Sequence, residues 1–256
     1  MTTAGSAAET AAQDTDEDDA PTTDRLEGAD RYATAAQLAL ASHEDAQTAI
    51  LASGEDFPDA LVASYGPAGV DAPILLSRHD TVPDVTLDAL DDLGVESVFL
   101  AGGEAALSDG VLDEVQQDHD AFRIDGATRY ETATLMLEGF DPPEVGTLDG
   151  DRTALLTSGE DFADALAAGP VAGSADLPLL LTTPQRSAVT EATADAMEGT
   201  RHDVDIERVI IVGGSEAVGE DVEAYLADER GFEVERWRGV GVEPLTGAPV
   251  PHPRDT

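Results

Sequence analysis

The sequence contains neither cysteine nor lysine. Without cysteine, the chain has no disulfide bond, no thiolate nucleophile and no cysteine-ligated zinc or iron–sulfur centre. Without lysine, it lacks the phosphate-binding lysine of a P-loop, a Schiff-base amine and a lysine general base. These two absences exclude several classes of enzyme, and they leave the cellular compartment open.

Long apolar segments are absent as well. No stretch approaches the roughly 18 consecutive apolar residues of a membrane-spanning helix, so we expect no transmembrane segment. Residues 1–24 are rich in threonine, alanine and acidic residues, and they lack the basic and then apolar order of a secretory signal. We expect residues 1–24 to form a disordered acidic leader.

Basic residues are scarce. The chain has 13 of them, all arginine, against 54 acidic residues, and its net charge is −41. This charge opposes binding to the phosphate backbone of a nucleic acid. It also repels itself within a compact fold, unless molar salt shortens the Debye length to about 3 Å. Because 41% of the residues are apolar and occur in periodic runs, we expect a folded protein of a salt-loving organism rather than a disordered chain.

A series of four segments occurs twice in the sequence, in the same order, which indicates a tandem duplication. The pairs are Arg25–Ala36 with Arg123–Thr134, Ser53–Ala63 with Ser158–Ala168, Ala72–Leu76 with Leu177–Leu181, and Leu100–Gly103 with Ile211–Gly214.

The second copy is longer than the first. Its extra residues fall at 141–150 and 199–205, where turn residues cluster, and we expect loops there. A third copy begins within 232–239, at Arg236, and then stops, since no Arg-Tyr-x-Thr-Ala segment follows. We therefore divide the chain into the leader, a first repeat at 25–124, a second repeat at 125–239 and an irregular tail at 240–256.

Short apolar strands alternate with amphipathic helices in both copies. This alternation predicts an α/β fold of tandem repeats, each with a short parallel sheet of about four strands flanked by helices in Rossmann-like layers. In the first copy we expect helices at 31–42, from 57, from 83 to the stop at 94, and at 108–118, and strands at 48–53, 73–76, 97–101 and 121–124. In the second copy we expect helices near Arg129, Phe162, Ser187 and Ala217, and strands near Thr153, Leu177, Arg208 and Phe232.

The order Arg-x-x-Gly-Ala-x-Arg-Tyr-x-Thr-Ala, Ser-Gly-Glu-Asp-Phe-x-Asp-Ala-Leu, Pro-x-Leu-Leu and Gly-Gly resembles the cell wall-binding repeat 2 family. The resemblance covers residues 25 to 239, and the acidic composition makes a haloarchaeal type the expectation. It implies an α/β repeat, normally in three copies that pack together, and non-covalent attachment to anionic polymers of the cell surface. With a net charge of −41, such attachment requires bridging cations, neutral glycan contacts or arginine-rich faces.

Two Arg-Tyr pairs open predicted helices: Arg31 with Tyr32, and Arg129 with Tyr130. Each arginine could bind a carboxylate or phosphate through two hydrogen bonds, and each tyrosine could stack on a sugar ring. The structural alternative is an ion pair with a neighbouring acid and a tyrosine packed in the core.

A second group of candidates follows the first strand of each copy. At this edge of an open α/β sheet, backbone amides favour anions and ligands bind. For the serines, Asp56 and Asp161, the alternative roles are helix capping and tight-turn formation. For Asp59 and Asp164, the alternative is a favourable interaction with the helix dipole. The candidates are Ser53, Asp56, Asp59, Ser158, Asp161 and Asp164.

The glycine pairs Gly102–Gly103 and Gly213–Gly214 follow a later strand in each copy. They could let a phosphate or glycan approach the backbone closely, or they could simply form a turn. The Gly-x-Gly-x-x-Gly pattern of a dinucleotide site is absent.

We find no catalytic constellation. The five histidines are scattered without metal-ligand spacing, and neither repeated serine lies in a Gly-x-Ser-x-Gly elbow. Paired acids such as Asp56 and Asp59 are expected by chance in so acidic a chain. We therefore expect no catalytic residue, no metal and no cofactor.

The hypothesis is a non-enzymatic cell-surface attachment module of a halophilic organism that binds an envelope glycan or surface glycoprotein, with self-association through the repeats. A small glycan-active enzyme or a nucleotide-binding α/β protein is the alternative. The expected location is the cell surface or the extracellular space, with the cytoplasm as the alternative.

Overall fold

The computed structural model describes residues 25–55, 72–138, 145–199 and 205–238. The expected leader, the expected tail at 240–256 and the helix expected from residue 57 lie outside the described residues. The candidate residues Asp56 and Asp59 lie outside them as well.

The first unit contains one parallel sheet with the strand order β2-β1-β3-β4. Ile50 of the central strand pairs with Ile74 on one side and with Phe99 on the other. The elements are α1 (Arg31–Ser42), β1 (Thr48–Ser53), β2 (Ile74–Ser77), α3 (Asp84–Asp92), β3 (Ser97–Ala101), α4 (Asp109–Val115) and β4 (Asp120–Ile124).

The second unit repeats this topology. Its parallel strands follow the order β7-β6-β8-β9, which matches the order of the first sheet. The elements are α5 (Arg129–Glu138), β5 (Thr147–Leu148), β6 (Asp151–Ser158), α6 (Phe162–Ala175), β7 (Leu179–Thr182), α7 (Ala188–Met197), β8 (Arg208–Val212), α8 (Glu220–Ala224), the π-helix η2 (Tyr225–Glu229) and β9 (Glu233–Trp237). The predicted α/β fold of two parallel sheets with flanking helices is confirmed.

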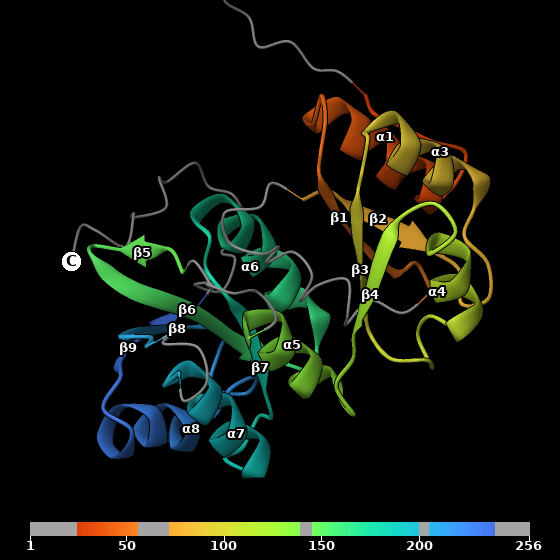
Figure 1. Cartoon of the computed structure of the whole chain (residues 1–256). Coiled ribbons are helices and arrows are strands. Elements are labelled where there is room, and N and C mark those ends of the chain that lie inside the picture. Colours follow the sequence, from red (N-terminus) through yellow and green to blue (C-terminus); the bar gives the residue numbers. More distant parts are fainter. Residues whose placement is uncertain (1–24, 56–71, 139–144, 200–204, 239–256) are drawn as a thin grey trace, which may run out of the picture.

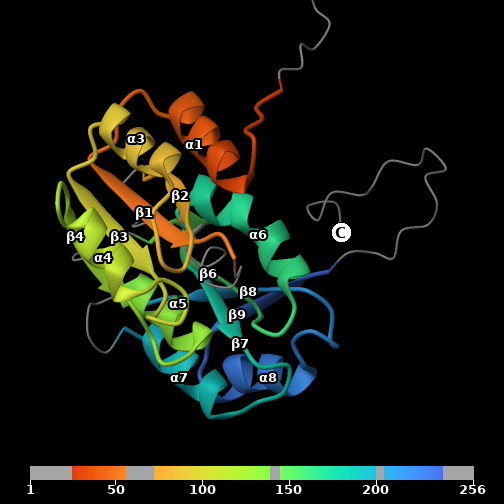
Figure 2. The ribbon, with the colours of Figure 1, turned by 90° about the vertical axis from the view of Figure 1, so that its right-hand side faces the viewer.

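The central strands are apolar and buried, as strands covered on both faces must be. In the first unit, Leu51 and Leu75 pack with the residues of α1 and α3. In Figure 1, α7 and α8 lie on one side of the second sheet and α6 lies on the other. Figure 2 shows the same layers from the side, with α1 and α3 over the first sheet.

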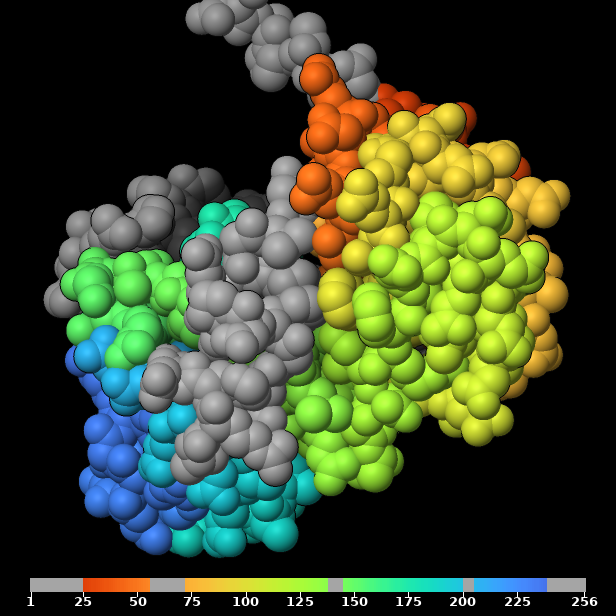
Figure 3. Space-filling view, in the orientation of Figure 1, coloured from red at the N-terminus to blue at the C-terminus, as the bar shows by residue number. Residues whose placement is uncertain are grey.

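One hydrophobic cluster is shared by the two units, and the first unit has a second cluster of its own. Ile50 and Ala52 of β1 point away from the core beneath α1 and belong to a larger cluster. That cluster also contains Met136 and Leu137 of α5, together with the core of the second sheet. Figure 3 shows the two units side by side, the first in red to yellow-green and the second in green to blue. Burial of one apolar surface therefore stabilises both copies together.

The segment expected as a loop at 141–150 contains a strand. β5 pairs with the start of β6 in an antiparallel hairpin. Its two turn residues, Asp149 and Gly150, both have positive φ, 55° and 101°. This conformation is typical of a type I′ turn, for which Asp-Gly is a favoured sequence. The loop prediction was wrong for 147–148. It relied on the turn residues and did not consider that the residues beside them could pair as short strands.

Residues at the expected start of a third copy complete the second sheet. β9 contains Arg236 and pairs in parallel with β8, as β4 contains Arg123 and pairs with β3. In each unit the last strand therefore carries the arginine of the repeat motif. No helix in the described part of the chain is long and apolar enough to cross a membrane.

Candidate binding site at the carboxyl edge of the sheets

The repeated serines end the central strands and shape the turns that follow. The Ser53 Oγ atom accepts a hydrogen bond from the backbone N–H of Glu55 at 3.2 Å. The Ser158 Oγ atom accepts the equivalent bond from Glu160, also at 3.2 Å. Both serines are buried. Each hydroxyl thus satisfies a turn amide in the way expected of serine at such a position.

The Arg-Tyr pairs hold these same turns. The Nη1 atom of Arg129 donates a hydrogen bond to the Gly159 carbonyl oxygen at 2.9 Å, and Arg31 donates the equivalent bond to the Gly54 carbonyl. A Cβ atom added to Gly159 would lie 2.4 Å from the Tyr130 ring. Each turn therefore needs glycine at this position. Among the residues that the structure describes, the partner of each arginine is a backbone carbonyl, where the structural alternative expects a neighbouring acid.

Within the Gly-Ala-x-Arg-Tyr-x-Thr segment, a hydrogen bond joins the first glycine to the threonine in both copies. The Gly126 N–H donates to the Thr132 Oγ1 atom at 3.2 Å, and the Gly28 N–H donates to Thr34 at 3.1 Å. A Cβ atom on Gly126 would lie 2.3 Å from Glu131 of the first helical turn. We assigned no role to this glycine or this threonine from sequence, although both recur in the two copies.

The glycine pairs are also held by repeated arginines. Arg123 donates to the Gly102 carbonyl at 3.1 Å, and Arg236 donates to the Gly213 carbonyl at 3.1 Å. The first glycine of each pair has positive φ, 105° for Gly102 and 123° for Gly213, which glycine adopts without strain. The second glycines, Gly103 and Gly214, are less enclosed, and nothing lies within 4 Å of a Cβ atom placed on Gly214.

The start of α6 carries two acidic candidates, Asp161 and Asp164, and brings the second of them to the Gly213 turn. The Asp161 Oδ1 atom caps α6 by accepting a hydrogen bond from the Ala163 N–H at 3.2 Å. A Cβ atom on Gly213 would lie 2.4 Å from the Asp164 Oδ2 atom, so that carboxyl group lies against the turn after β8. Burial raises the pKa of Asp164, and the nearby charge of Asp161 raises it further.

The position of Tyr130 at this edge changes the pKa of its hydroxyl group. Burial raises the pKa of Tyr130, Glu160 raises it further, and Arg129 partly offsets both effects. Residues from the starts of two helices thus meet turns at the carboxyl edge of the second sheet. Arg129 and Tyr130 meet the turn after β6, and Asp164 meets the turn after β8.

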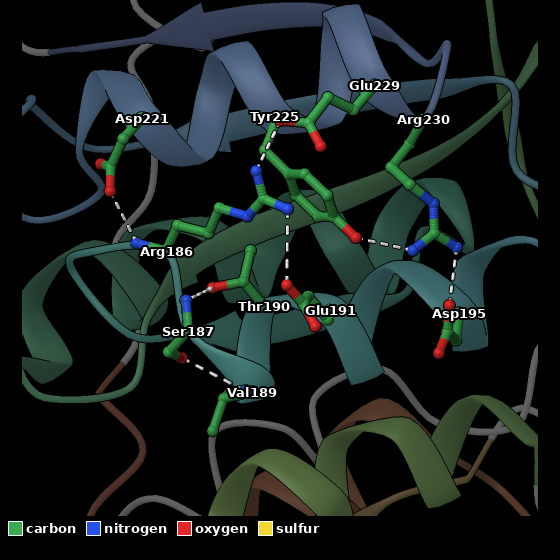
Figure 4. A network of polar contacts seen from close by, with 10 residues as sticks. All are labelled: Arg186, Ser187, Val189, Thr190, Glu191, Asp195, Asp221, Tyr225, Glu229 and Arg230. Atoms are coloured by element: carbon green, nitrogen blue, oxygen red, sulfur yellow. Dashed lines mark hydrogen bonds and ion pairs between the residues drawn. The ribbon is translucent and has the colours of Figure 1, made fainter.

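Arg186 and Arg230 lie close together around the ring of Tyr225 (Figure 4). The Arg186 Cζ atom lies 3.9 Å from the centroid of this ring, and the Arg230 Nη1 atom donates to the Tyr225 hydroxyl at 2.7 Å. Arg186 pairs with Glu229 at 2.5 Å. The hydrogen bonds that Arg230 donates to Glu198, Tyr225 and Asp195 raise its pKa, even though burial opposes this. Since acids already neutralise both guanidinium groups, this face is unsuited to anions.

Arg208 is surrounded by acids in the same way. It contacts Asp149, Asp151 and Glu233, the nearest at 2.8 Å. Within the described ranges, no group of three or more histidine or acidic side chains is placed to hold a metal ion.

Comparison with known proteins identifies one family in both units. The family described as Cell wall binding domain 2 (CWB2) matches residues 25–112 and 123–223. The matched ranges include both Arg-Tyr pairs and both glycine pairs described above.

Two curated proteins of Bacillus subtilis (strain 168) are similar to the chain. N-acetylmuramoyl-L-alanine amidase LytC is 26% identical over 199 residues, which are 77% of this chain and 37% of that protein. Amidase enhancer is 27% identical over 210 residues, which are 82% of this chain and 27% of that protein. The chain thus spans well under half of the length of either relative.

Among solved structures, Cwp6 from Clostridium difficile has a similar fold. The TM-score is 0.71 at 22% sequence identity, and the match covers 84% of this chain and 33% of that one. At this identity the likeness concerns the fold.

Proposed function

Because the chain belongs to the Cell wall binding domain 2 family, with two copies of the domain, we propose that it is a non-enzymatic module that attaches to a polymer of the cell envelope. The observation that carries this proposal is the family match across both α/β units. A location at the cell surface follows from the same proposal. The polymer is an envelope glycan or the glycan of a surface glycoprotein.

The hydrogen bonds of the repeated residues support binding over catalysis. Ser158, Arg129 and Asp161 each have a partner in the backbone of a turn or helix end. A serine that already bonds a turn amide, with no histidine beside it in the sequence motif, lacks the base that would activate it. The repeated motif therefore supports a rigid edge onto which a polymer can bind.

The ligand-contacting part of the proposal concerns the carboxyl edge of each sheet. In the first unit it involves Gly103, with Arg31, Ser53 and Gly102 holding the turns; Tyr32, expected from sequence to stack on a sugar, is instead buried against the Gly54 turn. In the second unit it involves Tyr130, Asp161, Asp164 and Gly214, with Arg129, Ser158 and Gly213 holding the turns. Ligands of open α/β sheets bind at this edge because the strand ends and helix starts meet there.

Operation in concentrated salt, as in a salt-loving archaeon, is a further part of the proposal. It is supported by the net charge of −41 and by the use of arginine for every basic residue. Screening over about 3 Å in molar salt would remove most repulsion between the surface carboxylates and a polymer with acidic groups.

Sedimentation with purified envelopes tests the proposed function. The full chain is mixed with envelopes of the organism that encodes it, in 3 M KCl, and its folding is checked by circular dichroism. We expect the folded chain to sediment with the envelopes and to remain in solution after the glycans are oxidised with periodate. A folded chain that stays in solution with intact envelopes would sink the proposal. Release of sugars that depends on Asp161 and Asp164 would instead favour the glycan-active enzyme.

A further inference from the structure

α5 and α7 of the second unit pack against each other and leave a pocket between their first turns. Its volume is about 230 Å³, and Tyr130, Thr134, Val189 and Ala192 are among the residues that line it. Both helices begin at the carboxyl edge of the second sheet, so the pocket lies beside the turn that Tyr130 holds. In Figure 4 the Val189 side chain points away from the arginine network around Tyr225.

We propose that this pocket binds one neutral pyranose residue of the envelope glycan. This inference rests on the proposed function and names the ligand class for one part of the same edge. A pocket of about 230 Å³ is smaller than the ~300–1,000 Å³ typical of sites for drug-sized molecules. It therefore suits a single sugar ring and is too small to enclose a nucleotide or an oligosaccharide.

The walls match the two kinds of surface on a sugar ring. Tyr130, Val189 and Ala192 offer apolar surface to the C–H groups of the ring. Thr128, Thr134 and Glu131 add oxygen atoms at the side of α5. The Thr134 hydroxyl already donates to the Glu131 carbonyl at 2.9 Å, so it faces a ligand as an acceptor. Acceptors of this kind select a ligand that donates hydrogen bonds, as sugar hydroxyl and acetamido groups do.

Charge selects a neutral ring over an anionic one. No arginine is among the residues that line the pocket, whereas Glu131 lies at its side. The neighbouring Arg129 guanidinium donates to the Gly159 carbonyl. A phosphate or uronate in the pocket would therefore meet the Glu131 carboxylate without a facing cation, in a chain of net charge −41.

The first unit differs at the corresponding tyrosine. The Arg78 Cζ atom lies 5.2 Å from the centroid of the Tyr32 ring. In the second unit, the residue after the equivalent strand is Thr183, and within the described residues no guanidinium lies over the Tyr130 ring. The two copies have therefore diverged at this place, and the sugar subsite is a property of the second unit.

The test compares the full chain with two pocket variants on an array of neutral and acidic glycans in 2 M KCl. Ala192→Phe fills the pocket, and Thr183→Arg introduces the arginine that covers the tyrosine in the first unit. Ala41→Phe adds the same ring to an exposed position of α1 and is the matched control. Circular dichroism melting confirms that each variant folds.

We expect binding to neutral members of the array, at least a tenfold loss in both pocket variants and no loss in Ala41→Phe. Methyl signals of Val189 and Ala192 should shift in NMR spectra on addition of a neutral oligosaccharide that the array identifies. The proposal is overturned if the chain binds only acidic glycans, if it binds none, or if folded Ala192→Phe binds as the parent does.

The two tests distinguish a failure of the sugar-pocket proposal from a failure of the proposed attachment function. If the parent and Ala192→Phe sediment equally with envelopes, attachment stands and the pocket is not its sugar site. If the array shows pocket-dependent binding while the chain stays in solution with envelopes, the sugar site stands and attachment fails.

Discussion

The Nη1 atom of Arg129 lies 2.9 Å from the carbonyl oxygen of Gly159, although 30 residues separate them in the chain. The first residue of α5 thus fixes the turn that follows β6, and Tyr130 packs on the same glycine. The first unit repeats both contacts through Arg31 and Tyr32. Recurrence of the whole set in two copies indicates that the motif preserves the geometry of the sheet edge.

The contact between Tyr130 and Gly159 predicts the effect of a single methyl group. Gly159→Ala should destabilise the chain by about 1–3 kcal/mol, because the added Cβ atom must displace a packed ring. Gly214→Ala is the matched control, since its Cβ atom meets nothing within 4 Å and should change stability by less than about 0.5 kcal/mol. Urea unfolding in 3 M KCl measures both, and equal stabilities would contradict the packing argument.

Arg123 should contribute more to stability than an exposed arginine. Its guanidinium donates to the Gly102, Leu107 and Ser108 carbonyls, and its side chain is only 10% exposed. Arg123→Gln should cost about 2 kcal/mol or more, because these acceptors lose a charged donor. Arg152→Gln, at a side chain 36% exposed, should cost less than about 1 kcal/mol. Similar losses in the two variants, measured by urea unfolding, would refute this ranking.

Asp164 should make a pH-dependent contribution to stability. Burial and Asp161 raise its pKa in the folded state, so folding favours the protonated form and the ionised form costs stability at neutral pH. We expect Asp164→Asn to be at least as stable as the parent at pH 7, with the difference shrinking as the pH falls through the folded-state pKa. Thermal melts between pH 3 and 7 test this. Asp88→Asn removes one charge from an exposed position of α3, and an identical pH profile for both variants would count against the explanation.

Stability should rise steeply with salt. Between 0.1 and 1 M KCl the Debye length falls from about 10 Å to about 3 Å, and repulsion within a chain of net charge −41 falls with it. We expect the melting temperature to increase over this range and to increase less in a variant with five exposed acids neutralised. Suitable positions are Glu44, Asp45, Asp88, Asp92 and Glu104. The same increase in parent and variant would show that salt acts through hydration alone.

The fold was largely predictable because the two copies confirm each other. α1 and β1 have the bounds expected from sequence, and the Asp30 Oδ1 atom caps α1 by accepting from the Ala33 N–H at 2.9 Å. Local rules suffice there, since caps and apolar runs depend on neighbouring residues. The π-helix at Tyr225–Glu229 was missed, and so was β5, because a π turn depends on tertiary contacts and a strand of two residues has almost no pattern of its own.

The site was less predictable than the fold. The sequence motif identifies Arg31 and Arg129 as special, but the partners that the described part of the chain supplies are carbonyl groups, which any residue could offer. A carboxylate partner is the natural expectation from side-chain chemistry, and composition alone cannot reveal a backbone acceptor. The pocket beside Tyr130 was likewise missed, because it depends on how α5 and α7 meet.

The seam between the two copies falls next to a strand and leaves no flexible spacer. β4 ends at Ile124 and α5 begins at Arg129. Between them, the Gly126 N–H donates a hydrogen bond to Thr132 of α5. Tension along a tethered chain would therefore pass directly from one sheet into the next helix. The backbone hydrogen bonds between β3 and β4, together with those that Arg123 donates, would bear the load. This architecture therefore suits a protein that must resist shear at a surface.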